Sequence, residues 1–237
     1  MFEVAAHYWY LTCSLVYAII ITGLARFTLT RAQFALTMLS GLIVLPVLVF
    51  VPFLEGNYWH PVRLGGWVIG IEDALISFDS SANAWYLVAV AFGPRLEYRY
   101  QFGRSLRRYL LAIVVPAAIY LAGIRLRWDP MTALLLTYLL AGFVFWCWHR
   151  SDWRFIVIGG FGYCLTLYAI ERVSFGFFPG MIQQWNLDGP WGAVIAGLPL
   201  GEIVWALLYG AYWPLFTALV YEVTLRPRSD TVAPSAG

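Results

Sequence analysis

Charged residues are scarce in this sequence. Asp, Glu and Arg make up only 12% of the 237 residues, lysine is absent, and 61% of the residues are hydrophobic. A soluble domain of this length would carry about a quarter charged residues. The low charge therefore excludes an ordinary soluble domain and places the chain among integral membrane proteins. A net charge of only +2 gives no sign of a nucleic-acid partner.

Residues that bind metals and cofactors are also few. The chain has three cysteines and three histidines, and none of them has the spacing of a metal or redox site. The sequence lacks the Gly-x-Gly-x-x-Gly and P-loop motifs that cradle phosphates. We therefore expect neither a metal nor a cofactor.

Long apolar runs fill most of the chain. They predict seven membrane spans, at roughly residues 8–25, 34–54, 68–92, 107–124, 131–148, 155–178 and 191–223. The last run is too long for one perpendicular helix, so its span is expected to begin after Pro199. The sequence thus predicts an all-α integral membrane protein, with one domain over residues 1–225 and a disordered polar tail over residues 226–237.

The distribution of arginine predicts the orientation. With the N-terminus outside, the predicted inner loops hold eleven of the fifteen arginines, and the outer loops hold Arg63, Arg125, Arg127 and Arg172. Cytoplasmic loops carry the excess of basic residues. We therefore expect an outer N-terminus and a cytoplasmic C-terminus in a cell inner membrane, with the third and seventh spans running in the same direction.

Three acids fall near the starts of apolar spans: Glu72 and Asp73 in the third, and Glu202 in the seventh. A charged side chain at the centre of a membrane helix costs about 2.5–3.5 kcal/mol on insertion scales, so such acids are functional candidates. Because the two spans run in the same direction, these acids should lie at similar depth in the outer half of the bilayer. The structural alternative is an ion pair with Arg63 or Arg172.

Other acids have simpler interpretations. Glu171 and Glu222 lie at the ends of predicted spans and are expected to act as interface anchors. Asp188 lies in a predicted outer loop, and no role is predicted for it.

The segments around the intramembrane acids resemble each other. Each has a tryptophan, a polar turn, a glycine-bearing apolar stretch and then an acid. Their alignment places Asp73 opposite Glu202. This predicts two three-helix direct repeats, at about 8–92 and 131–223, joined by a connector helix at about 107–124.

Two motifs carry a resemblance to a known family. They are Trp59-His60-Pro61 with Gly65 and Ile71-Glu72-Asp73, and Trp185-Asn186-Leu187 with Gly197, Pro199-Leu200, Glu202 and Tyr212-Trp213-Pro214. In this order they resemble the small integral-membrane lycopene cyclases, which include heterodimeric bacterial forms and fused archaeal and fungal forms. The resemblance implies a fold related to the helical membrane prenyltransferases. The sequence departs from the family pattern at Gly70, where proline is usual, and at Gly201, where glutamate is usual.

Carboxyl groups in an apolar site suit proton transfer to a carbon–carbon double bond. Burial disfavours the charged form of a carboxyl, so such a group can hold a proton and deliver it. Protonation of a terminal double bond, attack by a neighbouring double bond and loss of a proton would close a ring without redox chemistry. With this chemistry, the resemblance implies a lycopene cyclase-like isomerase of carotenoid biosynthesis that acts on a lipophilic polyene, with Glu72, Asp73 and Glu202 as catalytic residues.

Aromatic side chains make up 18% of the chain. Their faces stabilise carbocations without trapping them, by about 1–2 kcal/mol each when desolvated. The residues predicted to bind the substrate are Trp59, Trp67, Trp185, Trp205, Tyr209 and Tyr212, together with Asn186, which the family resemblance suggests.

Other functions remain open from the sequence. A related protein could hydrate the same cation or cyclise another membrane terpenoid. A non-catalytic carotenoid- or quinone-binding subunit is favoured by Gly201, which stands where an acid is usual. A small transporter could use the acids as proton relays, but the spans lack further charges to continue a relay. The sequence is also compatible with a homo-oligomer.

Overall fold

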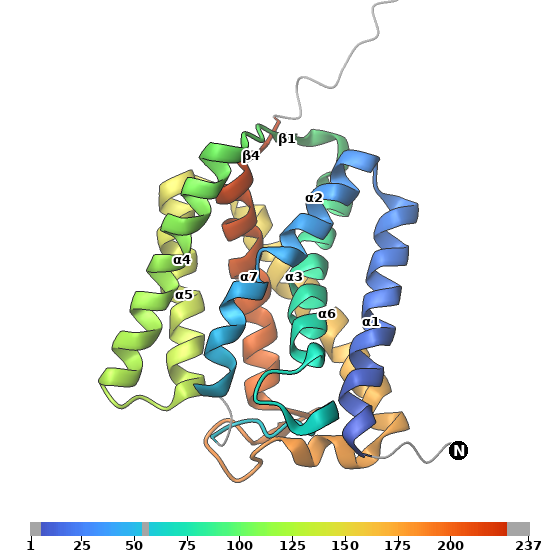
Figure 1. The fold of residues 1–237 in the computed structure, drawn as a ribbon. Coiled ribbons are helices and arrows are strands. Elements are labelled where there is room, and N and C mark those ends of the chain that lie inside the picture. The colour runs from blue at the N-terminus through green and yellow to red at the C-terminus, as the bar shows by residue number, and fades with distance from the viewer. Residues whose placement is uncertain (1–5, 54–56, 227–237) are drawn as a thin grey trace, which may run out of the picture.

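The computed structural model describes residues 6–53 and 57–226 as a helical bundle (Figure 1). Its long helices are α1 (Ala6–Thr28), α2 (Arg31–Leu42), α3 (Ile71–Phe92), α4 (Phe102–Arg125), α5 (Pro130–His149), α6 (Trp153–Phe177) and α7 (Leu200–Tyr221). With the 3-10 segment η1 (Leu45–Phe53) extending α2, seven helices in the described ranges are long and apolar enough to cross a membrane. The prediction of seven apolar helices is confirmed.

The second span is α-helical over only its first half. Thr30 and Gln33 form a reciprocal capping box that starts α2. After α2 ends at Leu42, the chain continues as η1, which contains Pro46 and Pro52. Proline lacks an N–H group and clashes with the preceding helical turn, so two prolines within nine residues disfavour a regular α-helix here. The uniform span predicted over 34–54 is therefore two segments of different geometry.

Helix α7 forms the centre of the bundle. It packs against α3, α4, α5 and α6, and almost all of its side chains from Tyr209 to Tyr221 are buried. Close packing against α6 depends on two glycines. A β carbon on Gly210 would lie 2.5 Å from the carbonyl oxygen of Gly159, so only glycine lets the two backbones approach this closely.

A β-hairpin precedes α7. Strands β2 (Val194–Ile195) and β3 (Leu198–Pro199) pair antiparallel, and Gly197 turns between them with a φ of 86°. Glycine adopts this left-handed conformation without steric cost. Pro199 is the N-cap residue of α7, so the prediction that the last span begins after Pro199 is confirmed.

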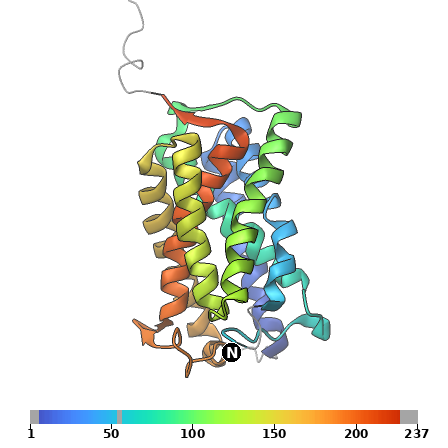
Figure 2. The ribbon, with the colours of Figure 1, turned by 90° about the vertical axis from the view of Figure 1, so that its left-hand side faces the viewer.

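The two ends of the bundle differ (Figures 1 and 2). At one end, which we call the sheet end, η3 (Gly93–Arg95) leads into β1 (Leu96–Tyr98), and β1 pairs with β4 (Val223–Leu225). Here Glu222 forms ion pairs with Arg104 and Arg108, as an interface anchor would. The other end, which we call the loop end, carries η2 (Leu64–Gly66), η4 (Pro179–Gln184) and the β2–β3 hairpin.

The predicted disordered tail begins one residue too early. Arg226 continues the β1–β4 pairing, because its backbone N–H donates to the carbonyl of Arg95 and its side chain pairs with Glu97. The rest of the predicted tail, residues 227–237, lies outside the described residues.

At the loop end, the two loops that lead to α3 and α7 pair with each other. Trp59 and Trp185 form an isolated antiparallel bridge. The Asn186 N–H donates to the Tyr58 carbonyl, and the His60 N–H donates to the Gln184 carbonyl. The two segments aligned in the sequence are therefore neighbours in space.

Candidate active site

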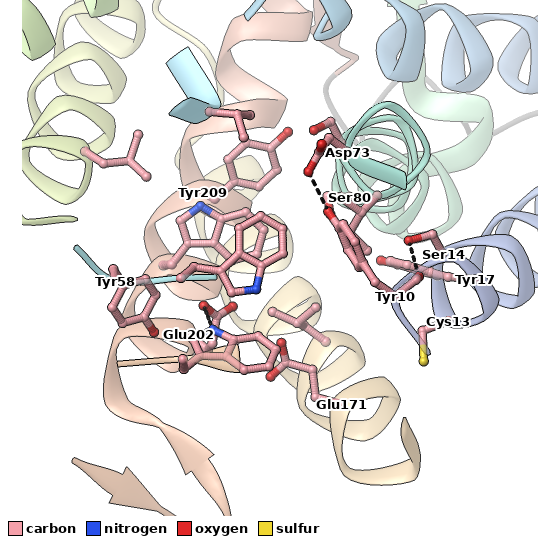
Figure 3. Close-up of a pocket in the computed structure, with 18 of the residues that line it drawn as sticks. Tyr10, Cys13, Ser14, Tyr17, Tyr58, Asp73, Ser80, Glu171, Glu202 and Tyr209 are labelled. Atoms are coloured by element: carbon pink, nitrogen blue, oxygen red, sulfur yellow. Dashed lines mark hydrogen bonds between the residues drawn. The ribbon is translucent and has the colours of Figure 1, made fainter. Parts of the chain in front are cut away.

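A cavity of about 220 Å³ lies inside the loop end (Figure 3). Its wall comes from α1, η1, α3, α5, α6, α7 and the two paired loops. It brings together six of the predicted site residues: Asp73, Glu202, Trp59, Trp185, Trp205 and Tyr209. Most of the remaining lining is apolar or aromatic. The acids of the third and seventh spans thus share one cavity.

Asp73 is held by four hydrogen bonds. Arg63 donates to it twice, from Nε at 2.5 Å and from Nη2 at 3.1 Å. The Tyr10 hydroxyl donates at 3.1 Å, and the backbone N–H of Gly70 donates at 2.7 Å. The Asp73 side chain is 1% exposed and that of Arg63 is 4% exposed. Both carboxyl oxygens of Asp73 are thus fully bonded, and the ion pair anticipated with Arg63 is present.

Glu72 turns away from the cavity. It is fully buried, and its Oε1 accepts a 2.7 Å hydrogen bond from the backbone N–H of Leu64. A β carbon on Gly70 would collide with Oε2 of Glu72. Glu72 therefore occupies the space that a proline at position 70 would need. Glu72 therefore joins the loop before α3 to the first turn of that helix.

Glu202 lies in the cavity wall at the start of α7. The Trp185 indole N–H donates to its Oε1 at 2.8 Å. The buried Tyr58 hydroxyl lies near the same carboxyl but has no hydrogen-bond partner among the described residues. Burial raises the pKa of Tyr58 far above its ordinary value. A β carbon on Gly201 would collide with the Tyr58 ring. The phenol of Tyr58 thus fills the place of a side chain at position 201.

Glu171, near the C-terminal end of α6, faces Glu202 across the cavity (Figure 3). The two carboxyls are close enough to interact directly, and Oε2 of Glu171 is buried with no hydrogen-bond partner among the described residues. Two negative charges close together in an apolar cavity repel each other strongly. The expectation that Glu171 is an interface anchor is therefore wrong.

A ladder of stacked rings runs along α7 from the cavity toward the bundle core. Trp205 stacks on Tyr209 with ring centroids 5.2 Å apart, and Tyr209 stacks on Trp213 at 5.6 Å. Trp213 in turn stacks on Phe216 at 4.9 Å. Spacings of three and four residues place these rings on one helix face. The ladder gives the cavity an aromatic wall next to Glu202.

Three predicted substrate-binding residues do not line this cavity. Trp67 is 70% exposed on the loop after η2. Asn186 uses its side-chain amide to donate to the carbonyl of Asn57, so it stabilises the paired loops. Tyr212 lies on α7 in the wall of a second, smaller cavity.

Asp79 is a buried acid to which the sequence analysis gave no role. It is fully buried on α3, and neither carboxyl oxygen has a hydrogen-bond partner within the described ranges. The nearby Asn83 donates to the Tyr17 hydroxyl and to Thr166. The sequence did carry a signal for Asp79, because an acid in the middle of an apolar span is a functional candidate.

In the part of the chain that the structure describes, no group of three His, Cys, Asp or Glu side chains could hold a metal ion. No family model, no curated protein sequence and no solved structure matches this chain. Function is therefore inferred from the chemistry of the cavity.

Proposed function

We propose that this protein is a membrane isomerase that cyclises the end group of a polyene by proton transfer, as the resemblance to the membrane lycopene cyclases implies. The observation that carries the proposal is the pair of facing carboxyls, Glu171 and Glu202, in a mostly apolar and aromatic cavity. The sequence pointed to Glu202 for this role, and the geometry adds Glu171.

The reaction starts with the proton that the carboxyl pair shares. One carboxyl gives it to the terminal double bond of the substrate, which forms a tertiary carbocation. The neighbouring double bond attacks this cation and forms the new carbon–carbon bond of the ring. A carboxylate of the pair then removes a proton from the carbon beside the resulting ring cation. The product is an isomer of the substrate, and the pair regains one proton.

Aromatic and ionic groups stabilise the cation in this scheme. The rings of Trp205, Tyr209 and Trp185 line the cavity beside the carboxyl pair, and cation–π attraction to each is worth about 1–2 kcal/mol when desolvated. Asp73 lies in the same cavity, where it is ion-paired with Arg63. We assign Asp73 a fixed electrostatic role, since its oxygens are already saturated, and Glu72 a structural one.

The proposal includes the predicted repeat and orientation. The bridge between Trp59 and Trp185 supports the repeat, because it relates equivalent positions of the two proposed three-helix units. The N-terminus lies outside and the C-terminus in the cytoplasm of a cell inner membrane. The cavity then opens in the outer half of the bilayer, near water that can recharge the acids.

Expression in a lycopene-accumulating bacterium tests the proposal. Chromatography of the pigments should show cyclised product with the wild-type chain and none with Glu202→Gln. Unchanged lycopene that copurifies with the protein would instead support a carotenoid-binding subunit. A hydroxylated acyclic product would support a hydratase, in which water traps the same cation.

A further inference from the structure

A second cavity, of about 70 Å³, adjoins the first. The two share six lining residues: Val44, Val47, Phe50, Leu134, Tyr138 and Tyr209. The smaller cavity continues from this common wall between η1, α4, α5 and α7. We call it the side chamber. It leads away from the carboxyl pair, and it contains Tyr212, which the sequence predicted to contact substrate.

The side chamber presents mostly hydrocarbon and ring surface. The buried Tyr120 hydroxyl in its wall has no hydrogen-bond partner among the described residues, whereas three other polar side chains of the wall bond elsewhere. Thr137 donates to the Ala133 carbonyl, and the Trp213 indole donates to Ser40. The Tyr209 hydroxyl is hydrogen-bonded to Ser81. Apolar cavities in protein cores stay dry and take up hydrocarbons. The side chamber, at about 70 Å³, is large enough to hold a group bigger than one water molecule, which needs roughly 10–15 Å³.

The wall between the two cavities is formed by η1 and Tyr138. One side is η1, whose 3-10 geometry has weaker hydrogen bonds than an α-helix and none of whose residues is fully buried. The other side is Tyr138, whose ring packs edge-on against Tyr209 with centroids 5.3 Å apart. A narrow chain passing between η1 and Tyr138 would join the cavities into one channel.

We propose that the side chamber binds the linear tail of the substrate while its end group lies beside Glu171 and Glu202. This inference rests on the proposed function. It narrows the substrate class of the enzyme to acyclic isoprenoid polyenes that are longer than the main cavity. The carboxyl pair acts on the end group, and the side chamber selects for chain length.

Two adjacent alanines on α4 allow a matched test. Ala117 lines the side chamber, whereas Ala118 is exposed on the outer face of the same helix. Ala117→Phe should fill the chamber, and Ala118→Phe should leave it open. Ile113 lies one turn before Ala117 and lines the same chamber, so Ile113→Trp provides a second filling variant.

Binding is measured by quenching of tryptophan fluorescence in detergent, with lycopene and with acycloretinal, which has one acyclic end group on a shortened chain. Ala117→Phe and Ile113→Trp should weaken lycopene binding about tenfold or more and leave acycloretinal binding within about twofold. Ala118→Phe should match the wild type for both ligands. Retained acycloretinal binding also shows that a variant is folded.

Wild-type lycopene affinity in both filling variants would overturn the proposal, as would equal losses for the two ligands. Neither result depends on turnover. If the chain binds both polyenes but makes no cyclic product, the proposed function fails while the side chamber is still tested.

Discussion

At the scale of single residues, Glu171 and Glu202 decide whether the cavity can deliver a proton. We predict that Glu202→Gln and Glu171→Gln each lower cyclase activity by about 100- to 10,000-fold, because an amide cannot act as the acid. The assay is product formation by purified, folded protein. Glu222→Gln is the matched control: it removes an acid at the sheet end, where Glu222 contacts Arg104 and Arg108, and should leave turnover unchanged. Full activity in both cavity variants would exclude the pair as proton donor.

The ion pair between Asp73 and Arg63 makes a separate prediction about stability. Breaking a buried pair by removing one partner typically costs about 3–5 kcal/mol. Asp73→Asn should therefore lower the melting temperature in detergent strongly. The double variant Asp73→Asn with Arg63→Gln should be more stable than Asp73→Asn alone. A double variant no more stable than the single one would show that the pair contributes little.

The sequence identified some site residues and missed others for a definite reason. Asp73 and Glu202 stand out because they interrupt apolar runs. Glu171 precedes Arg172 near the end of a span, where charged residues normally meet the membrane interface. Which way a side chain at a helix end points depends on how the helix is rotated against its neighbours. That rotation is set by tertiary packing, which hydropathy does not encode.

At the scale of elements, the contact between α6 and α7 depends on glycine. We predict that Gly159→Ala destabilises the protein, because its β carbon would collide with the Gly210 carbonyl and overpacking typically costs about 1–3 kcal/mol. Gly176→Ala, on the same helix, is the control. A β carbon there meets no atom within 4 Å, and alanine favours the helix by up to about 1 kcal/mol. Thermal unfolding in detergent should rank Gly159→Ala below the wild type and Gly176→Ala at or above it.

Element boundaries followed the hydropathy pattern closely, whereas element type did not always do so. The span predicted over 131–148 corresponds to α5, Pro130–His149. The run over 34–54 is equally apolar, yet its second half is the 3-10 segment η1. Hydropathy measures transfer into lipid and does not depend on backbone geometry. The prolines at positions 46 and 52 were the available signal for the change.

At the scale of the whole molecule, the predicted orientation can be measured directly. In a variant without native cysteines, single cysteines replace Asp188 at the loop end or Arg107 near the sheet end; both positions are exposed. A membrane-impermeant maleimide applied to intact spheroplasts should label Asp188→Cys, and it should label Arg107→Cys only after lysis. The opposite pattern would invert the topology and place the cavity in the inner half of the bilayer.

The path of the proton tests how the whole molecule works, because it links the aqueous phase, the carboxyl pair and the substrate. The hydrogen added to the terminal double bond differs from the hydrogen lost when the ring cation is quenched. The pair exchanges its proton with water between turnovers, so turnover of lycopene in deuterated water should place one deuterium in each new ring, at the carbon that was protonated. Rings without deuterium would mean that closure does not begin with a solvent-derived proton.

The aromatic wall of the cavity should matter for the same reaction, because Trp205 stacks on Tyr209 beside Glu202. Trp205→Ala should slow formation of labelled rings more than it weakens lycopene binding, because cation–π stabilisation grows only as charge develops. Equal losses of rate and binding would reduce Trp205 to a packing residue.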